Sequence, residues 1–303
     1  MRLVHIVLPS EHGLRLESVL RGSMAISANQ LRRTKRIGLP ILLDGQPSFT
    51  NQRVSTGQRV EIELSGFAGD SPLLASEPAP AVSLSVLYED DCLLVVWKTA
   101  FIKTHAPASA HKEPDSLEAR VTHMLSCPAH PVHRLDAETS GPVVFAKDPY
   151  VQHTLQQAMA DGLWEKEYRA WVYHAPDPES GIIRGSIRRE TPDSFTRIVA
   201  EDGKEAVTRY QVLAQKECFG ETVSLLCLSP LTGRTHQLRV HLLHIGCPIL
   251  GDKRYALAES DALSEKLNLA RQQLCSVALS FPHPLRKETV SVRHEEDLEL
   301  SIP

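Results

Sequence analysis

The first 66 residues alternate short amphipathic segments with short apolar ones. Apolar residues at Leu14, Leu16, Val19 and Leu20 predict a short amphipathic helix. A second helix is predicted after Ser27, a favourable N-cap residue, and is expected to end at Gly38. Short strands are predicted at 41–43 and 60–64, with a turn at Asp44-Gly45. Together these elements predict a small compact α/β unit.

After residue 83 the pattern is mixed, and strands outnumber helices. Strands are predicted at 84–88, 92–97, 142–147, 167–173, 205–213, 222–228, 274–281 and 289–293. Helices are predicted at roughly 115–125, 149–160, 235–245 and 260–270. Because the strands follow one another in runs instead of alternating with helices, we expect an α+β fold with a mixed, largely antiparallel sheet flanked by helices.

A stretch rich in Pro, Ala and Ser separates the two patterns. Proline opposes both helix and central strand, so we interpret this stretch as a linker. The predicted organisation is a small basic domain at 1–66, a linker at 67–83 and a larger domain at 84–303.

Composition places the chain among ordinary globular proteins, with 42% hydrophobic and 23% charged residues among 303. The apolar runs are much shorter than the ~20 residues that cross a bilayer, so no membrane association is expected. The apolar start lacks a signal-peptide cleavage site, and the six cysteines form no C-x-x-C pair. We therefore expect a cytoplasmic protein.

The net charge of −4 conceals an asymmetry, because residues 1–66 carry +4 and the remainder carries −8. The second predicted helix exposes four cations: Arg32, Arg33, Lys35 and Arg36. A basic face of this kind is typical of a surface that binds a polyanion, although an ordinary solvated helix face has the same pattern.

Three segments carry candidate chemistry. The first is HRLDAETSG at 133–141, a polar turn that leads into an apolar strand. Thr139 and Ser140 can fix the turn through backbone hydrogen bonds, which would hold Asp136 at the edge of a sheet as a nucleophile or base. An ordinary loop with a turn-capping aspartate remains the alternative.

The other two segments are a strand and a helix. In KEYRAWV at 166–172 the alternation puts Tyr168 on one strand face, where the ring could stack on a base or simply pack in the core. In TGRTHQLRVHL at 232–242, Thr235 is a possible helix cap and Arg239 lies at the edge of the apolar stripe. Arg239 could keep Asp136 ionised, or be a surface arginine.

Cofactor motifs are absent from the sequence, which contains neither a G-x-G-x-x-G nor a Walker loop. Fourteen histidines raise the alternative of a metal-dependent hydrolase. Its candidate ligands would be His133, Asp136, His236, His241 and His244. The spacing of five between His236 and His241 differs from the i, i+4 pair of zincins, so no metal is expected.

Taken in order, H-R-L-D-x-x-T-S-G, K-E-Y-R-A, L-T-G-R-T-H-Q-L-R-V-H-L and G-x-P-I-L-G-D-x-x-Y resemble the motifs of RluA-type RNA pseudouridine synthases. The resemblance covers roughly residues 84–293. Residues 1–66 resemble, more weakly, the small alpha-L RNA-binding domain that often precedes this catalytic domain.

The resemblance implies isomerisation of specific uridines in structured RNA, either rRNA or tRNA, without a cofactor. Asp136 matches the family's catalytic aspartate, Arg239 its ion-pair partner and Tyr168 the tyrosine that stacks on the target ring. Arg134 matches a residue that helps fill the space left by the flipped nucleotide. We expect a monomer, and a non-catalytic RNA-binding protein with the same fold is the alternative.

The sequence departs from the family pattern beside the site. Trp97-Lys98-Thr99 stands where the family usually has Asn-Lys-Pro, so Lys98 is kept and is predicted to contact RNA. Pro142 follows Ser140-Gly141, where an aliphatic residue is usual. These changes are expected to alter the rim of the pocket. RNA binding is thus predicted for Arg134, Arg32, Arg33, Lys35, Arg36 and Lys98.

Overall fold

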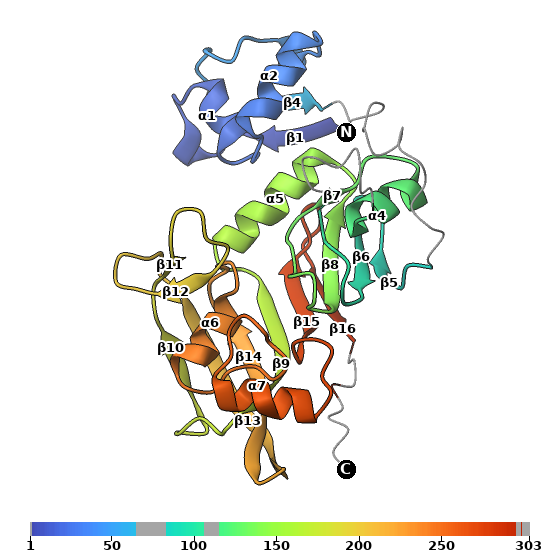
Figure 1. Cartoon of the computed structure of the whole chain (residues 1–303). Helices are drawn as coiled ribbons and strands as arrows, with labels where there is room; N and C mark the ends of the chain where they lie inside the picture. Colours follow the sequence, from blue (N-terminus) through green and yellow to red (C-terminus); the bar gives the residue numbers. More distant parts are fainter. Residues whose placement is uncertain (1, 65–82, 106–114, 295–297, 299–303) are drawn as a thin grey trace.

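The computed structural model describes residues 2–64, 83–105, 115–294 and 298 (Figure 1). An N-terminal unit lies at the top of the view, and two antiparallel sheets with their helices lie below it. No helix in these described ranges has both the length and the hydropathy that a bilayer crossing needs.

The N-terminal unit contains a four-stranded sheet and two helices. The strand order is β1 (Arg2–Ile6), β4 (Arg59–Glu63), β2 (Ile41–Leu43) and β3 (Gln46–Pro47). Helices α1 (Leu16–Arg21) and α2 (Ala28–Arg36) accompany it, with a 3₁₀ turn η1 (Pro9–Glu11) after β1. The Ser27 hydroxyl accepts the Gln30 N–H, as expected of an N-cap. Both predicted helices and both predicted strands are confirmed, whereas β1 and β3 were not predicted.

The second sheet is ordered β5 (Val86–Glu89), β6 (Leu93–Lys98), β8 (Gly141–Ala146) and β7 (His130–Pro131). Every residue of β6 and β8 is buried, because a helix covers each face. Helix α4 (Leu117–Leu125) packs on the face that carries Leu94 and Phe145. Helix α5 (Pro149–Ala160), capped by Asp148, packs on the face that carries Val95 and Val144.

The third sheet has six strands. Their order is β10 (Ser180–Arg184), β13 (Val207–Cys218), β14 (Glu221–Pro230), β9 (Glu165–Tyr173), β15 (Leu274–Pro282) and β16 (Thr289–Arg293). A hairpin of β11 (Ile187–Arg189) and β12 (Arg197–Val199) follows β10. Helix α6 (Gln237–His244) packs Leu238 and Leu242 against Ala170 and Leu226, while α7 (Ala258–Lys266) places Leu263 beside Trp171.

The four-stranded sheet that contains β8 and the six-stranded sheet that contains β15 meet where these two strands pass each other. Ser140 pairs with Cys275 in a parallel bridge, and the Ser276 N–H donates to the Ser140 carbonyl at 2.9 Å. Gly141 has a φ of +141°, and a Cβ there would lie 2.5 Å from the Ser276 Cβ. Only glycine allows so close an approach of the two strands.

The predicted α+β class with antiparallel sheets is confirmed. The short strands β7, β10, β11 and β12 were not predicted. The structure also corrects one cap, because the N-cap of α6 is His236 and not Thr235. The predicted linker at 67–83 lies outside the described residues except for Ser83, so the division into two domains stays a prediction.

Candidate active site

The loop that carries Asp136 is pinned on both sides of that residue. The Thr104 hydroxyl bonds both the backbone N–H and the carbonyl of Leu135, each at 3.2 Å. The Lys98 ammonium donates to the Ala137 carbonyl at 2.9 Å, and the Gln272 amide donates to the Thr139 hydroxyl at 2.8 Å. These contacts fix the direction of the Asp136 side chain at the edge of the sheet.

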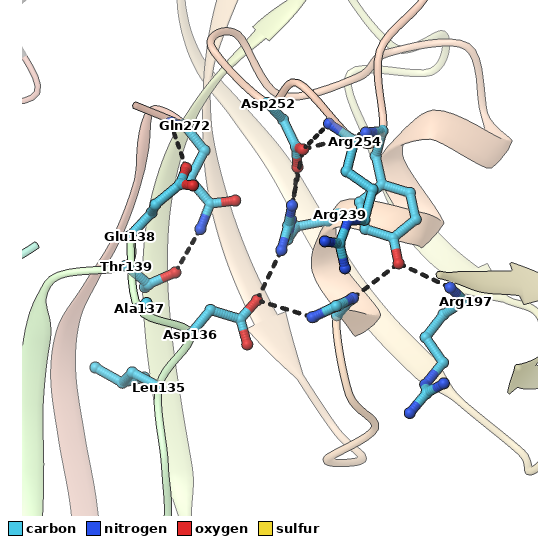
Figure 2. A network of polar contacts seen from close by, with 12 residues as sticks. Leu135, Asp136, Ala137, Glu138, Thr139, Arg197, Arg239, Asp252, Arg254 and Gln272 are labelled. Carbon is cyan, nitrogen blue, oxygen red and sulfur yellow. Dashed lines mark hydrogen bonds and ion pairs between the residues drawn. The ribbon is translucent and has the colours of Figure 1, made fainter. Parts of the chain in front are cut away.

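Arg239 reaches Asp136 from the first turns of α6. Its Nη1 donates to Asp136 Oδ2 at 3.1 Å, and its Nε and Nη2 form a bidentate pair with Asp252 at 2.6 and 2.8 Å. Figure 2 shows Arg239 between the two carboxylates. The exposed fraction of the side chain is 23% for Asp136 and 1% for Asp252. The carboxylate that remains open to a ligand is therefore Asp136.

The charges of this group keep Arg239 protonated. Burial lowers the pKa of Arg239, but the hydrogen bonds and charges of Asp252 and Asp136 outweigh burial and raise it above its usual value. Arg239 is therefore a permanent cation in direct contact with Asp136.

His236 and Tyr255 lie beside Arg239 and Asp136. The Tyr255 hydroxyl lies 2.8 Å from His236 Nδ1 and accepts the Arg197 backbone N–H at 2.8 Å. His236 Nε2 lies 3.8 Å from Asp136 Oδ2. Burial lowers the pKa of His236 to about 4. The charge of Asp136 raises this pKa, and the charges of the nearby arginines lower it further. The imidazole is therefore neutral at neutral pH, and the positive charge beside Asp136 comes from Arg239. The Arg239 guanidinium also lies 4.8 Å from the Tyr255 ring centroid.

Two cavities meet at Asp136. A cavity of about 400 Å³ is lined by Tyr168, Leu274 and Asp136, and a wider one of about 1010 Å³ is lined by the same carboxylate. Burial raises the pKa of Tyr168 to about 12, so the phenol is protonated at neutral pH. The smaller cavity falls in the size range of ligand pockets. Its volume is large enough for one aromatic base beside the Tyr168 ring and the Asp136 carboxylate.

Comparisons with known proteins agree with this geometry. Residues 92–244 match the RNA pseudouridylate synthase family. An uncharacterized RNA pseudouridine synthase of Chlorobaculum parvum is 34% identical over 289 residues, which cover 86% of this chain and 85% of that protein. The chain belongs to the RluA-type RNA pseudouridine synthase family. It is an RNA-modifying isomerase.

Two further relatives extend the match. The dual-specificity RNA pseudouridine synthase RluA of Escherichia coli is 34% identical over 215 residues, covering 71% of this synthase and 94% of that enzyme. The solved structure of human RNA pseudouridylate synthase domain containing 1 superposes with a TM-score of 0.61 at 25% identity. It covers 73% of this chain and 86% of the human one. The resemblance inferred from the motifs is thereby confirmed.

The structure brings together Asp136, Arg239 and Tyr168, the three residues predicted to be catalytic. Arg134 is exposed and lines both cavities, which suits the predicted contact with RNA.

The predicted RNA contact of Lys98 is wrong in this structure. Its side chain is 0% exposed, and the ammonium donates to the carbonyls of Thr99, Ile102 and Ala137 at 2.9–3.0 Å. A buried ammonium with these partners cannot reach a phosphate. Lys98 instead ties the end of β6 to the loop of Asp136.

The four cations of α2 lie apart from the active site. Arg32 and Arg36 are exposed, whereas the Lys35 ammonium donates to the Thr50 hydroxyl at 2.7 Å. Arg33 is half-buried and lines a separate cavity of about 340 Å³ beside Gln152 of α5. Their predicted role in RNA binding stays a prediction.

Trp97 and Pro142, two residues that depart from the family pattern, are neighbours in the structure. Trp97 stands directly opposite Pro142 in the pairing of β6 with β8. The indole packs in the core and makes an edge contact with His294 at 4.3 Å between ring centroids. The two replacements therefore share one place in the sheet, behind the loop of Asp136.

Sequence analysis missed the roles of Asp252, Tyr255 and His236. All three stand in quoted motifs, but only the contacts across the fold show that Asp252 and Tyr255 contact Arg239 and that His236 lies against Tyr255. The alternative metal site is not assembled, since His133 Nε2 accepts the Val144 N–H at 3.2 Å. Both nitrogens of His241 are engaged in the core, with Thr208 and the Gly185 carbonyl.

One other cluster has metal-like spacing within the described residues: Asp90, Cys92 and His283. His283 Nδ1 accepts the backbone N–H groups of Leu285 and Arg286. Nε2 therefore carries the proton and donates it to Asp90 at 2.8 Å. The cluster is a hydrogen-bonded support for the start of β6.

Proposed function

We propose that this synthase converts specific uridines of a structured rRNA or tRNA to pseudouridine, with Asp136 as the catalytic carboxylate. The ion pair of Asp136 with Arg239 at the mouth of the Tyr168 cavity is the observation that supports this most directly. The relative from Escherichia coli is a dual-specificity RNA pseudouridine synthase.

The reaction breaks the bond between ribose C1′ and uracil N1, turns the base and joins C1′ to C5. The hydrogen on C5 leaves as a proton and N1 gains one, so no oxidant or group donor is consumed. Asp136 acts on the uridine as a carboxylate that Arg239 orients through their ion pair. The Tyr168 ring holds the detached base against the strand until the new bond forms.

Extrusion of the uridine from its stack costs a few kcal/mol. Stacking on Tyr168 returns roughly 1–3 kcal/mol. The remainder must come from contacts with the RNA backbone. The exposed guanidinium of Arg134, which lines both cavities, is one such contact.

The test is tritium release from RNA labelled at uridine carbon 5, prepared from cells that lack this gene. Asp136→Asn should abolish release, because the amide carries no charge, while RNA affinity stays within a few-fold of wild type. Asp261→Asn, an exposed aspartate on α7, is the matched control and should release tritium normally. Release by Asp136→Asn, or an inert wild-type enzyme that binds RNA, would overturn the proposal.

A further inference from the structure

The smaller cavity contains a second feature that the three catalytic candidates do not explain. Its charged lining residues are one carboxylate, Asp136, and four cations: Arg134, Lys166, Arg234 and Arg239. Arg239 is neutralised by Asp252 and Asp136. Arg134 and Arg234 are exposed to water. Lys166 is the half-buried cation of this set.

The surroundings of Lys166 are apolar. Its ammonium donates to the Met159 sulfur at 3.4 Å and lies 5.7 Å from the Trp164 ring centroid. Within the described ranges no salt bridge includes it. Sulfur is a weak acceptor, and an ammonium has three donors to satisfy. The free protein therefore leaves this group short of partners.

The nearest acids on its own strand face the other way. Side chains alternate along β9, so Glu167 points to the opposite face, where it pairs with Arg169 and Arg293. On the Lys166 side, His133 is neutral because burial lowers its pKa to about 3, and Tyr168 is a neutral phenol. The charged groups that line the cavity together with Lys166 are Asp136 and the arginines Arg134, Arg234 and Arg239.

We propose that Lys166 is a phosphate-binding residue of the active site, which takes a phosphodiester of the RNA next to the extruded uridine. Lys166 and Tyr168 are two residues apart on the same strand face, about 7 Å along β9. This separation matches the reach from a pyrimidine ring across its ribose to its own phosphate. The inference rests on the proposed function, since it assumes that the uracil lies on Tyr168.

Burial also gives the interaction a signature in pH. It lowers the pKa of Lys166 to about 8. Below pH 8 the free enzyme carries the ammonium, and above it the neutral amine predominates. A contact with phosphate should therefore weaken as pH rises through 8 in the wild type. It should persist in Lys166→Arg, whose guanidinium stays charged.

The experiment compares Lys166→Met and Lys166→Arg with Lys216→Met, another lysine that lies over a tryptophan, at 5.3 Å from Trp171, but exposed on β13. Lys166→Met should raise KM for tritium release from labelled RNA about tenfold, with kcat within about twofold of wild type. The slope of log affinity against log salt should fall by about one. Lys166→Arg and Lys216→Met should keep both values close to wild type.

A second readout separates binding from a structural role. Lys166→Met removes a half-buried charge whose described contacts include no acidic partner, so its melting temperature should equal or exceed that of wild type. A lower melting temperature, an unchanged salt slope, or loss of kcat at constant KM would overturn the inference. An unchanged slope with raised KM would indicate contact with the uracil. An inert wild type would instead count against the proposed function, while the salt slope still tests Lys166.

Discussion

Arg239 is shared by two carboxylates with different surroundings. Asp252 is almost wholly buried and accepts, besides both Arg239 contacts, the backbone N–H groups of Arg254 and Tyr255 at 3.0 and 3.1 Å. Asp136 accepts one Arg239 contact and faces the cavities. We therefore interpret Asp252 as the residue that positions the Arg239 guanidinium, and Asp136 as the carboxylate with which that positioned guanidinium pairs at the cavities.

Asp252→Asn tests this division at the residue scale. The bidentate ion pair is lost, so we expect kcat to fall about tenfold and the free energy of unfolding to fall by about 1–3 kcal/mol. Asp115→Asn is a matched control, because Asp115 forms a bidentate pair with Arg120 at 2.7 and 2.8 Å but is 50% exposed. It should cost less than about 1 kcal/mol and leave activity unchanged. Equal effects of the two substitutions would refute a special role for Asp252.

At this scale sequence analysis predicted catalytic roles for Asp136, Tyr168 and Arg239 because each stands in a long recognisable motif, and the structure brings the three side chains to one cavity. Lys98 stands in a motif as well, yet its interpretation was wrong. The direction of a lysine side chain depends on which carbonyls the tertiary fold presents to it, here those of Thr99, Ile102 and Ala137. The partner of a charged group is a property of the fold, which neighbours in sequence do not encode.

At the scale of elements, the join between β8 and β15 decides where the Asp136 loop ends. Gly141→Ala would place a Cβ 2.6 Å from the Ser276 carbonyl oxygen and 2.5 Å from its Cβ. We expect a loss of about 2–4 kcal/mol in the free energy of unfolding. Activity should fall as well, because the strands must separate beside the loop. Thermal melting and tritium release measure the two effects.

Gly220→Ala is the control for that substitution. Gly220 has a φ of +83° in the turn between β13 and β14, and a Cβ there would meet nothing within 4 Å. It should cost only about 1–2 kcal/mol, the strain of the left-handed backbone, and leave activity intact. If both substitutions lower the free energy of unfolding by the same amount, the close approach of β8 and β15 does not contribute to the loss of stability in Gly141→Ala.

The elements that sequence analysis recovered are those with strong periodicity. The buried runs of β6 and β8 and the amphipathic stripe of α6 were predicted within a few residues. Of the missed strands, β3, β7, β11 and β12 have two or three residues each, too few for a period to show. The other two, β1 and β10, have five residues each and contain no fully buried apolar run. The start of α6 was misplaced because Gln237 accepts the Arg234 N–H and the Thr232 hydroxyl, which organises the turn without a cap from Thr235.

At the scale of the whole molecule, positive charge is concentrated in residues 1–66, while the remainder carries a net charge of −8. Substitution of the exposed Arg32 and Arg36 by Gln should therefore weaken RNA binding and reduce the salt slope by about two. kcat should stay unchanged, since α2 lies apart from the cavities at Asp136. Filter binding over a salt series measures the slope.

The matched control replaces Arg15 and Arg21, exposed arginines beside or within α1, by Gln. It removes the same charge from the same part of the chain. Equal losses of affinity would indicate a general effect of charge instead of a contact through α2. No loss in either double variant would remove RNA binding from this unit.

The passage of β8 beside β15 has a consequence for how this enzyme class can diversify. The loop of Asp136 leads into the four-stranded sheet. Tyr168 lies in the six-stranded sheet, and Arg239 lies in the helix packed on that sheet. The proposed reaction centre thus lies at the seam between the two sheets, while β5 and β10 lie at outer borders of those sheets. Lengthening or trimming those borders leaves the seam untouched. New RNA shapes can be accommodated at the periphery without rebuilding the reaction centre.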